Sequence, residues 1–327
     1  MKDTQPLVSV IALCYNHSRF VLECLESIRN QTYKNKQLII IDDHSTDDSV
    51  AVIRDWVATH RVECVFVVHS ENKGVCRTLN DALSHASGKY VASTSTDDVW
   101  MLDKLEHQVR QMAELPEEVG VLYSDAWRMD QNGVMLPKLF IEYHRSFSAP
   151  PEGDILDTLI EGNFIPAMTT LIRRSCYVKV GKYDESLCYE DWDMWIRISQ
   201  RYKFAFSPFI SAKYRVLPTS LIHTITYNGK VIETNFSIYA KCLKLDGVSA
   251  ARRRWLKDKL GVVAEAMYKD RHKRRNSFLW KTLKFDARLR TLGMLIFSVM
   301  ALRYNTFLDF DAWLARFRQK FESFAVK

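Results

Sequence analysis

Two adjacent aspartates, Asp97 and Asp98, follow a short β-prone run at residues 90–93. Two carboxylates held side by side can bind a hard divalent cation, and that cation can clamp two phosphate groups of a ligand. It would also neutralise the charge that develops on a departing nucleoside diphosphate. We expect residues 99–101 to begin a helix. Because an Asp-Asp pair is equally typical of a solvated turn or a helix cap, its chemistry depends on its surroundings.

A second acidic cluster, Asp42-Asp43-His44-Ser45, follows the apolar run at residues 38–41. Asp and Ser are frequent helix N-cap residues, so we expect one aspartate of this pair to cap the next helix. The other can accept a hydrogen bond from the imide of a nucleobase. Tyr15, which follows the first apolar run, can stack on the same base.

A third acidic pair, Glu190-Asp191, opens an amphipathic segment at residues 190–202. The positive end of a helix dipole lowers the pKa of a nearby carboxyl, so we expect Asp191 to stay ionised, as a general base for a sugar hydroxyl must be. The alternative is a capping acid on a structural helix. Trp192 offers an aromatic face on which an acceptor sugar can stack.

The elements that must position these residues are short apolar runs alternating with segments of helical period. This pattern predicts βαβ units and a mostly parallel sheet. The runs lie at residues 8–13, 38–41, 62–68, 90–93 and 119–123. Ligands of such sheets bind at the carboxyl ends of the strands, so we expect the polar residues after each run to meet at one edge.

Composition narrows the class of protein. The chain has 327 residues, of which 47% are hydrophobic, enough for one large α/β domain and a helical appendage. Its seven cysteines are scattered singly, which argues against a zinc site or a disulfide framework. No apolar segment approaches the roughly 20 residues of a membrane-spanning helix, and the N-terminal residues do not resemble a signal peptide. We expect a cytoplasmic location.

The C-terminal region differs in character. Residues 251–290 hold 14 Lys and Arg against 4 Asp and Glu, within a chain of net charge +7. We expect an α/β domain at residues 1–225 and three or four basic helices at residues 226–327. Interleaved basic and aromatic residues at 251–304 are typical of a helix on an anionic membrane surface. Packing on the catalytic domain or on a second subunit, in a homo-oligomer, is the alternative. No nucleic-acid partner is expected, because no recognised module accompanies the charge.

Several motifs, in this order, resemble the family 2 glycosyltransferases, the inverting enzymes of the GT-A fold. The resemblance covers about residues 7–223 and rests on VSVIALCYN, SIRNQTY, LIIIDDHSTDDS, ENKGVCRTLNDALSHASGKYVASTSTDD, YEDWDMWIR and KYRVLPTSL. It implies a Rossmann-like, mostly parallel sheet with flanking helices, followed here by a C-terminal helical extension. The Gln-x-x-Arg-Trp motif of processive members is absent after Asp191, so the chain resembles a bacterial-type, non-processive member.

The resemblance also implies roles for individual residues. Asp98 falls at the position of the metal ligand, for Mn²⁺ or Mg²⁺, and Asp97 near the ribose. Asp191, with Glu190 beside it, falls at the catalytic base, which implies a single displacement with inversion at the anomeric carbon. The positions expected to bind the nucleotide sugar are Leu13, Tyr15, Asn16, Asp43 and Asp97.

Two positions depart from the family pattern. The arginine that often precedes the residue at Asn80 is Leu79 here, and Arg77 is the nearest candidate phosphate partner. The histidine that many members carry is Leu217 here, and His223 is the candidate substitute on the phosphate or metal side.

The resemblance therefore implies an inverting, metal-assisted glycosyltransferase with a nucleotide diphosphate donor, a UDP-sugar being favoured. Its acceptor would be a hydroxyl of a glycan or a lipid-linked molecule, as in polysaccharide biosynthesis, with the enzyme peripheral on the inner face of the cytoplasmic membrane. A nucleotidyltransferase is one alternative, although the loop after the first run lacks the glycines common in that class. A catalytically inactive scaffold or membrane-binding protein with this fold is another.

Overall fold

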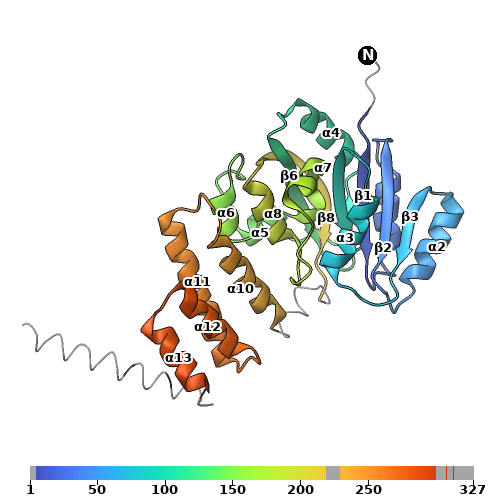
Figure 1. Ribbon diagram of the computed structural model, residues 1–327. Helices are drawn as coiled ribbons and strands as arrows, with labels where there is room; N and C mark the ends of the chain where they lie inside the picture. Colours follow the sequence, from blue (N-terminus) through green and yellow to red (C-terminus); the bar gives the residue numbers. More distant parts are fainter. Residues whose placement is uncertain (1–4, 219–228, 300–306, 308–311, 313–327) are drawn as a thin grey trace, which may run out of the picture. The chain divides into compact units, whose positions relative to one another are not determined.

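The computed structural model describes residues 5–218, 229–299, 307 and 312. The chain divides into two compact units, Met1–Ser220 and Leu221–Lys327, which are described separately (Figure 1). The expected boundary after residue 225 falls outside the described residues.

The first unit is built on an eight-stranded sheet in the order β3-β2-β1-β4-β7-β6-β8-β5. The strands are β1 Val8–Cys14, β2 Lys36–Asp42, β3 Cys64–Val68, β4 Tyr90–Ser95, β5 Val99–Trp100, β6 Val119–Met129, β7 Leu171–Arg173 and β8 Lys203–Arg215. The helices are α1 Val21–Arg29, α2 Ser49–His60, α3 Val75–His85, α4 Lys104–Glu114, α5 Phe140–His144, α6 Leu156–Glu161, α7 Arg174–Val180 and α8 Asp191–Ser199, with a 3₁₀ turn, η1, at Ala167–Thr169. The predicted α/β class with flanking helices is confirmed.

The strand pairing shows which edge of the sheet holds the carboxyl ends of the strands. β1 to β4 pair in parallel, and β6 pairs in parallel with β8. The short β7 runs antiparallel between β4 and β6, so β6 and β8 point the same way as β1 to β4. The carboxyl ends of six strands therefore lie along one edge of the sheet.

The core follows from alternation along β1. Val8, Val10 and Ala12 are buried on one face, in the same apolar cluster as residues of α1, α2 and α4. Ile11 points to the other face, where α3 packs on β1 and β2. Because both faces are covered, the central strands read as continuous apolar runs.

Two local predictions are wrong, and one long strand was missed. Residues 99 and 100 form the short strand β5, which pairs with β8, and the next helix begins only at Lys104. Neither Asp42 nor Asp43 caps α2, whose N-cap position is Asp48. Asp47 instead accepts a hydrogen bond from the backbone N–H of Ser49, at 3.0 Å. The long strand β8 was not anticipated from the sequence.

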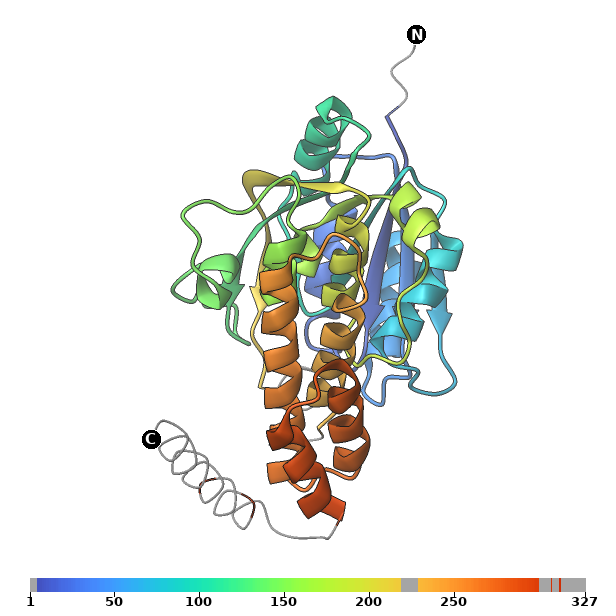
Figure 2. The same ribbon diagram turned by 60° about the vertical axis from the view of Figure 1, so that its left-hand side comes forward.

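The second unit contains, among its described residues, helices α10 Lys230–Cys242, α11 Ala250–Lys269, α12 Arg275–Phe285 and α13 Leu289–Val299. This agrees with the expected run of basic helices. α11 packs against α10, α12 and α13, and Figure 2 shows this helical arrangement from a second direction. Within the described part of the chain, no helix has the length and apolar character to cross a membrane.

Candidate active site

The turn Asp97-Asp98, directly after β4, is held by Arg215 at the carboxyl end of β8. The backbone N–H of Arg215 donates to Oδ1 of Asp98 at 2.9 Å, and its Nε–H donates to the carbonyl oxygen of Asp97 at 2.8 Å. The guanidinium pairs with Glu23 at 2.5 Å and lies 4.7 Å from the ring centroid of Phe20. Arg215 was quoted in a matching motif but given no role from the sequence. The structure identifies it as the residue that fixes the acidic turn.

The carboxyl of Asp98 is enclosed, with only 2% of the residue exposed. Burial raises its pKa well above the ordinary range, and the neighbouring charge of Asp97 adds to the rise. The backbone N–H and the guanidinium of Arg215 oppose this. The turn therefore concentrates negative charge that a bound cation would relieve.

Asp97 keeps one buried oxygen without a partner. Its Oδ1 is enclosed by protein and receives no hydrogen bond. Its Oδ2 lies 3.8 Å from Nε2 of His17, beyond hydrogen-bond distance, while Nδ1 of the same ring is 3.0 Å from the Thr96 hydroxyl. A buried oxygen with unused acceptor capacity is one that a ribose hydroxyl or a cation would satisfy. His17 was not singled out by the sequence.

The carboxylate of Asp43, after β2, is oriented by the segment that follows β3. Oδ1 accepts hydrogen bonds from Nδ1 of His69 and the backbone N–H of Lys73, each at 2.8 Å. Oδ2 accepts one from the backbone N–H of Gly74, at 2.8 Å. Gly74 has φ +81°, a left-handed conformation that glycine adopts without strain. The carboxylate is thus fixed in place, and Oδ2 retains acceptor capacity for a ligand.

The loops after β1 and β2 are tied together beside Asp43. Ser45 donates from its N–H and hydroxyl to Asp42, at 2.8 and 2.5 Å. The side-chain oxygen of Asn16 accepts from the N–H of Thr46 at 2.7 Å, so this predicted nucleotide-sugar contact braces the loops in the structure. Tyr15 is exposed at the rim. Leu13 lies in β1 between Ile41 of β2 and Ser95 of β4.

The pair Glu190-Asp191 lies at the start of α8, as predicted. The side-chain amide of Asn163 donates to Oδ2 of Asp191 at 2.6 Å, and the N–H of Trp192 donates to Oδ1 at 2.7 Å. Asn163 precedes η1 and was not singled out from the sequence. The structure makes it the side chain that orients Asp191.

The expected lowering of the Asp191 pKa is wrong. Residues Glu190 and Asp191 are both partly exposed. Protein nevertheless surrounds their carboxyls closely, and burial is the largest influence on both pKa values. Burial raises the pKa of Asp191 to about 6, against the hydrogen bonds from Trp192 and Asn163. Burial, with the charge of Asp191, raises the pKa of Glu190 to about 8. A carboxyl with a pKa near 6 can exchange a proton at neutral pH.

The charges of both acidic groups act on the hydroxyl of Tyr214. Burial raises the pKa of its hydroxyl, and the charges of Asp98, Asp97 and Asp191 raise it further. The structure therefore brings the turn after β4 and the start of α8 to the same neighbourhood. The first turn of α3 lies there too, because the charge of Glu190 raises the pKa of the Cys76 thiol.

Other predicted positions do not join this cluster. Trp192 is only 6% exposed and donates from Nε1 to the carbonyl of Leu159, so a role as an acceptor platform does not fit its burial. Arg77 pairs with Glu185 at 3.0 Å on the surface. Leu79 and Leu217, which replace the family's Arg and His, are buried apolar side chains. His223 lies outside the described residues.

The donor set at the acidic turn fits a hard divalent cation. Mn²⁺ and Mg²⁺ prefer oxygen ligands, and Mg²⁺ commonly uses one or two carboxylates together with substrate phosphates and water. Asp97 and Asp98 supply carboxylates of this kind, one with an unpartnered buried oxygen. Among the described residues no group of three or more His, Cys, Asp or Glu is arranged for a metal.

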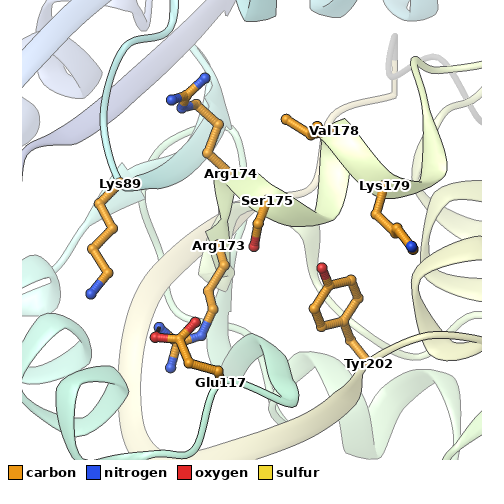
Figure 3. A pocket seen from close by; sticks show the side chains of 8 residues that line it. All are labelled: Lys89, Glu117, Arg173, Arg174, Ser175, Val178, Lys179 and Tyr202. Carbon is orange, nitrogen blue, oxygen red and sulfur yellow. Dashed lines mark hydrogen bonds and ion pairs between the residues drawn. The ribbon is translucent and has the colours of Figure 1, made fainter.

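A separate hollow of about 460 Å³ lies at the opposite edge of the sheet. Lys89, Glu117 and Tyr202 come just before β4, β6 and β8, at the amino ends of these strands. Figure 3 shows Ser175 and Lys179 of α7 beside Tyr202, and the guanidinium of Arg173 close to Glu117. Because it is remote from the acidic turn along β4, this hollow is not part of the candidate site.

The chain resembles known glycosyltransferases in sequence. The family model described as Glycosyl transferase family 2 matches residues 9–178. The chain is 28% identical over 239 residues to Uncharacterized glycosyltransferase RP339 of Rickettsia prowazekii (strain Madrid E), covering 73% of each chain. It is 31% identical over 175 residues to TuaG of Bacillus subtilis (strain 168), whose name assigns it provisionally to teichuronic acid biosynthesis, covering 53% of this chain and 65% of TuaG.

Solved structures share the fold. TarS 1-349 of S. aureus, in complex with UDP-GlcNAc, matches with a TM-score of 0.59 at 17% identity, over 88% of this chain and 78% of that chain. The mannosyltransferase PcManGT of Pyrobaculum calidifontis, in complex with GDP-Man and Mn²⁺, matches with a TM-score of 0.57 at 17% identity, over 96% and 85%. The chain spans 47% of a longer TarS chain. At these identities the likeness concerns the fold alone.

Proposed function

The chain belongs to glycosyl transferase family 2 and has the GT-A fold, and from that premise we propose that it transfers a sugar from a nucleotide diphosphate donor with inversion. The observation that carries this proposal is that one domain holds two acidic groups in place by hydrogen bonds: Asp97-Asp98 through Arg215, and Asp191 through Asn163. One group suits a nucleoside diphosphate and its cation, and the other suits proton abstraction from an acceptor hydroxyl.

The donor would lie along the loops after β1, β2 and β4. Asp43, held by His69, Lys73 and Gly74, would accept a hydrogen bond from the base. Tyr15 would stack on that base, and Leu13 and Asn16 would shape its pocket. Asp97 would accept a hydrogen bond from a ribose hydroxyl through its unpartnered oxygen. A uracil base is favoured by the family resemblance.

Asp98 would hold Mn²⁺ or Mg²⁺ at the diphosphate. When bound, the cation supplies positive charge that stabilises the leaving nucleoside diphosphate. Arg215 keeps Asp98 in place through its backbone N–H, and its guanidinium lies beneath the turn, against the carbonyl of Asp97. This arrangement leaves Oδ2 of Asp98 for the cation.

Asp191 would act as the general base. Its hydrogen bonds from Asn163 and Trp192 orient the carboxylate and favour its ionised form. With a pKa raised to about 6 it is mostly ionised at pH 7 yet basic enough to take a hydroxyl proton as the new glycosidic bond forms. Glu190, the neighbouring carboxyl with a raised pKa, would exchange protons beside it.

We further propose that residues 1–225 form the catalytic domain and that the acceptor is a glycan or lipid-linked molecule of polysaccharide biosynthesis. The basic helices of residues 226–327 would bring the enzyme to the inner face of the cytoplasmic membrane. TuaG, the relative whose name refers to teichuronic acid biosynthesis, supports an acceptor of this class.

A thermal-shift screen of UDP-, GDP- and dTDP-sugars, with and without Mn²⁺, tests the donor site. We expect one nucleotide class to raise the melting temperature by several degrees in the presence of Mn²⁺ and much less in its absence. The Asp98→Asn variant should lose the Mn²⁺-dependent part of the shift. Equal shifts in wild type and variant would contradict the metal assignment, and no shift with any donor would contradict the donor site.

A further inference from the structure

Helix α13 presents its apolar residues outward. Leu289, Leu292, Ile296 and Val299 are 60%, 41%, 49% and 67% exposed. At 3.6 residues per turn these positions lie within about 80° of one another around the helix axis. We call this set the α13 outer face. The inward positions Thr291, Met294 and Ser298 are buried, and two of the three are polar. A surface helix of a globular protein normally shows the reverse pattern.

Polar contacts fix this rotation of the helix. The inward hydroxyl of Ser298 accepts a hydrogen bond from Nε of Arg275 at 2.8 Å and donates to Oδ1 of Asn276 at 2.5 Å. Arg290, at the start of the helix, pairs with Glu265 of α11 at 2.9 Å. Turning the outer face inward would break these contacts. The outward placement of the four aliphatic side chains is therefore built into the fold of this unit.

The described C-terminal residue nearest to α13 leaves this face uncovered. Phe307 lies 5.8 Å from Phe297, between ring centroids, and within 3.0 Å of the position a Cβ on Gly293 would take. Both positions lie on a side of the helix other than the outer face. Tyr268 of α11 also contacts the Phe307 ring.

The net charge of the helical unit indicates the partner of the outer face. Residues 229–299 contain 17 Lys and Arg against 6 Asp and Glu, and α13 itself has no acidic residue. The adjoining helix α12 carries exposed Trp280 beside the exposed cation Lys281. A strongly cationic surface repels a second copy of itself. An apolar helical face combined with cationic and aromatic neighbours matches the interface of an anionic bilayer.

We propose that the α13 outer face inserts into the interfacial region of a membrane rich in anionic phospholipids. The basic residues of α11 and α12 would draw the unit to the negative surface, and the aliphatic residues would then enter the boundary between headgroups and acyl chains. This identifies the lipid-contacting surface that the proposed function requires for an acceptor presented at a membrane. The role of this surface rests on the proposed function. The surface itself is defined by the geometry of α13.

Flotation of the full chain with vesicles tests the proposal. The vesicles would be phosphatidylcholine alone, or phosphatidylcholine with about one third phosphatidylglycerol. We expect wild type to float with the anionic vesicles and the Leu292→Glu/Ile296→Glu variant to bind at least tenfold more weakly. The matched control Val178→Glu/Val262→Glu replaces two other exposed aliphatic residues by the same acids and should bind within twofold of wild type. Circular dichroism and thermal melting would establish that each variant is folded.

Three outcomes would overturn the proposal. The first is failure of wild type to bind anionic vesicles, and the second is equal weakening by the test and control variants. The third is a wild-type dimer that Leu292→Glu/Ile296→Glu dissociates, because the outer face would then be covered by a second copy of the chain. Asp98→Asn and Asp191→Asn should still bind vesicles, so failure of the catalytic proposal would be seen separately.

Discussion

The backbone N–H of Arg215 donates a hydrogen bond of 2.9 Å to Oδ1 of Asp98, although 117 residues separate the two in sequence. The Nε–H of the same arginine bonds to the carbonyl of Asp97. A single residue at the end of β8 thus holds both members of the acidic turn, from the segment in which the family histidine is replaced by Leu217.

Arg215→Lys should therefore impair the donor site while keeping the charge. Lysine cannot donate to the Asp97 carbonyl and to Glu23 in the same planar geometry, so the turn loses its side-chain support and keeps only the backbone bond to Asp98. We expect kcat/KM to fall about 100-fold, equivalent to about 2.7 kcal/mol, with weaker Mn²⁺-dependent binding of the nucleotide by calorimetry. Arg174→Lys, which alters an Nε contact with Gly88 at the opposite edge, should behave as wild type. Equal losses in both variants would contradict this role.

The pKa of Asp191 predicts the acidic limb of the activity profile. A general base must be ionised, so with a pKa of about 6 kcat/KM should be half-maximal near pH 6 and fall about tenfold per unit below it. Asn163→Ala removes a hydrogen bond that lowers this pKa, and the limb should move to higher pH. Asn132→Ala, an exposed control, should leave the limb in place. An unchanged limb in Asn163→Ala would count against Asp191 as the base.

Asp191→Asn should separate transfer from binding. The amide occupies the same space but cannot take a proton, so we expect transfer to fall by about 1000-fold. Binding of the nucleotide with Mn²⁺ should stay within threefold of wild type by calorimetry. Loss of nucleotide binding together with transfer would show that Asp191 acts at the donor site.

A substitution at Gly74 tests whether its backbone N–H holds the carboxylate of Asp43 in place. Alanine at φ +81° costs about 1–2 kcal/mol, and the shifted backbone N–H would release Oδ2 of Asp43. We expect Gly74→Ala to weaken nucleotide binding about tenfold. Gly133→Ala also places alanine at a positive φ, +82°, with open space around the added Cβ in both cases. This control should lose stability by urea unfolding and keep wild-type nucleotide affinity. Equal affinity in the two variants would contradict the role of Gly74.

Lys104 should make stability rise with pH. It is fully buried, and burial lowers its pKa to about 7, whereas the unfolded chain keeps the ordinary value near 10.5. Between these values the unfolded state binds more protons, so its proton uptake favours unfolding and the free energy of unfolding increases with pH. The slope should approach about 1.4 kcal/mol per pH unit. In urea unfolding from pH 7 to 10, the free energy of unfolding of wild type relative to that of Lys104→Met should rise with pH. Identical slopes would contradict the assignment.

Much of the fold could be predicted because the central parallel strands β1 and β2 are largely buried and appear as apolar runs. β8 could not. It contains Pro208, and its pairing with β6 is shifted between Ser124 and Ala126, which breaks the alternation of buried and exposed residues. Missing β8 also meant that Arg215 received no role.

Site residues that lie in a motif at the end of a strand were predicted from the sequence. The residues from distant loops that hold them by hydrogen bonds were missed. Asp43 fell after β2 as expected, but His69 reaches it from the end of β3, and no local pattern indicates that contact. The pKa of Asp191 was misjudged because only the helix dipole is visible in sequence. In the structure burial outweighs it, and burial depends on the tertiary packing around α8.

The most direct test of the central claim is release of nucleoside diphosphate from a panel of UDP-, GDP- and dTDP-sugars by the purified chain with a glycan or lipid-linked acceptor fraction. We predict acceptor-dependent release from at least one donor in the presence of Mn²⁺ or Mg²⁺. EDTA, Asp98→Asn or Asp191→Asn should each reduce it at least 100-fold. Release that persists at the wild-type rate in Asp98→Asn and Asp191→Asn would contradict the assignment of this site as the catalytic centre.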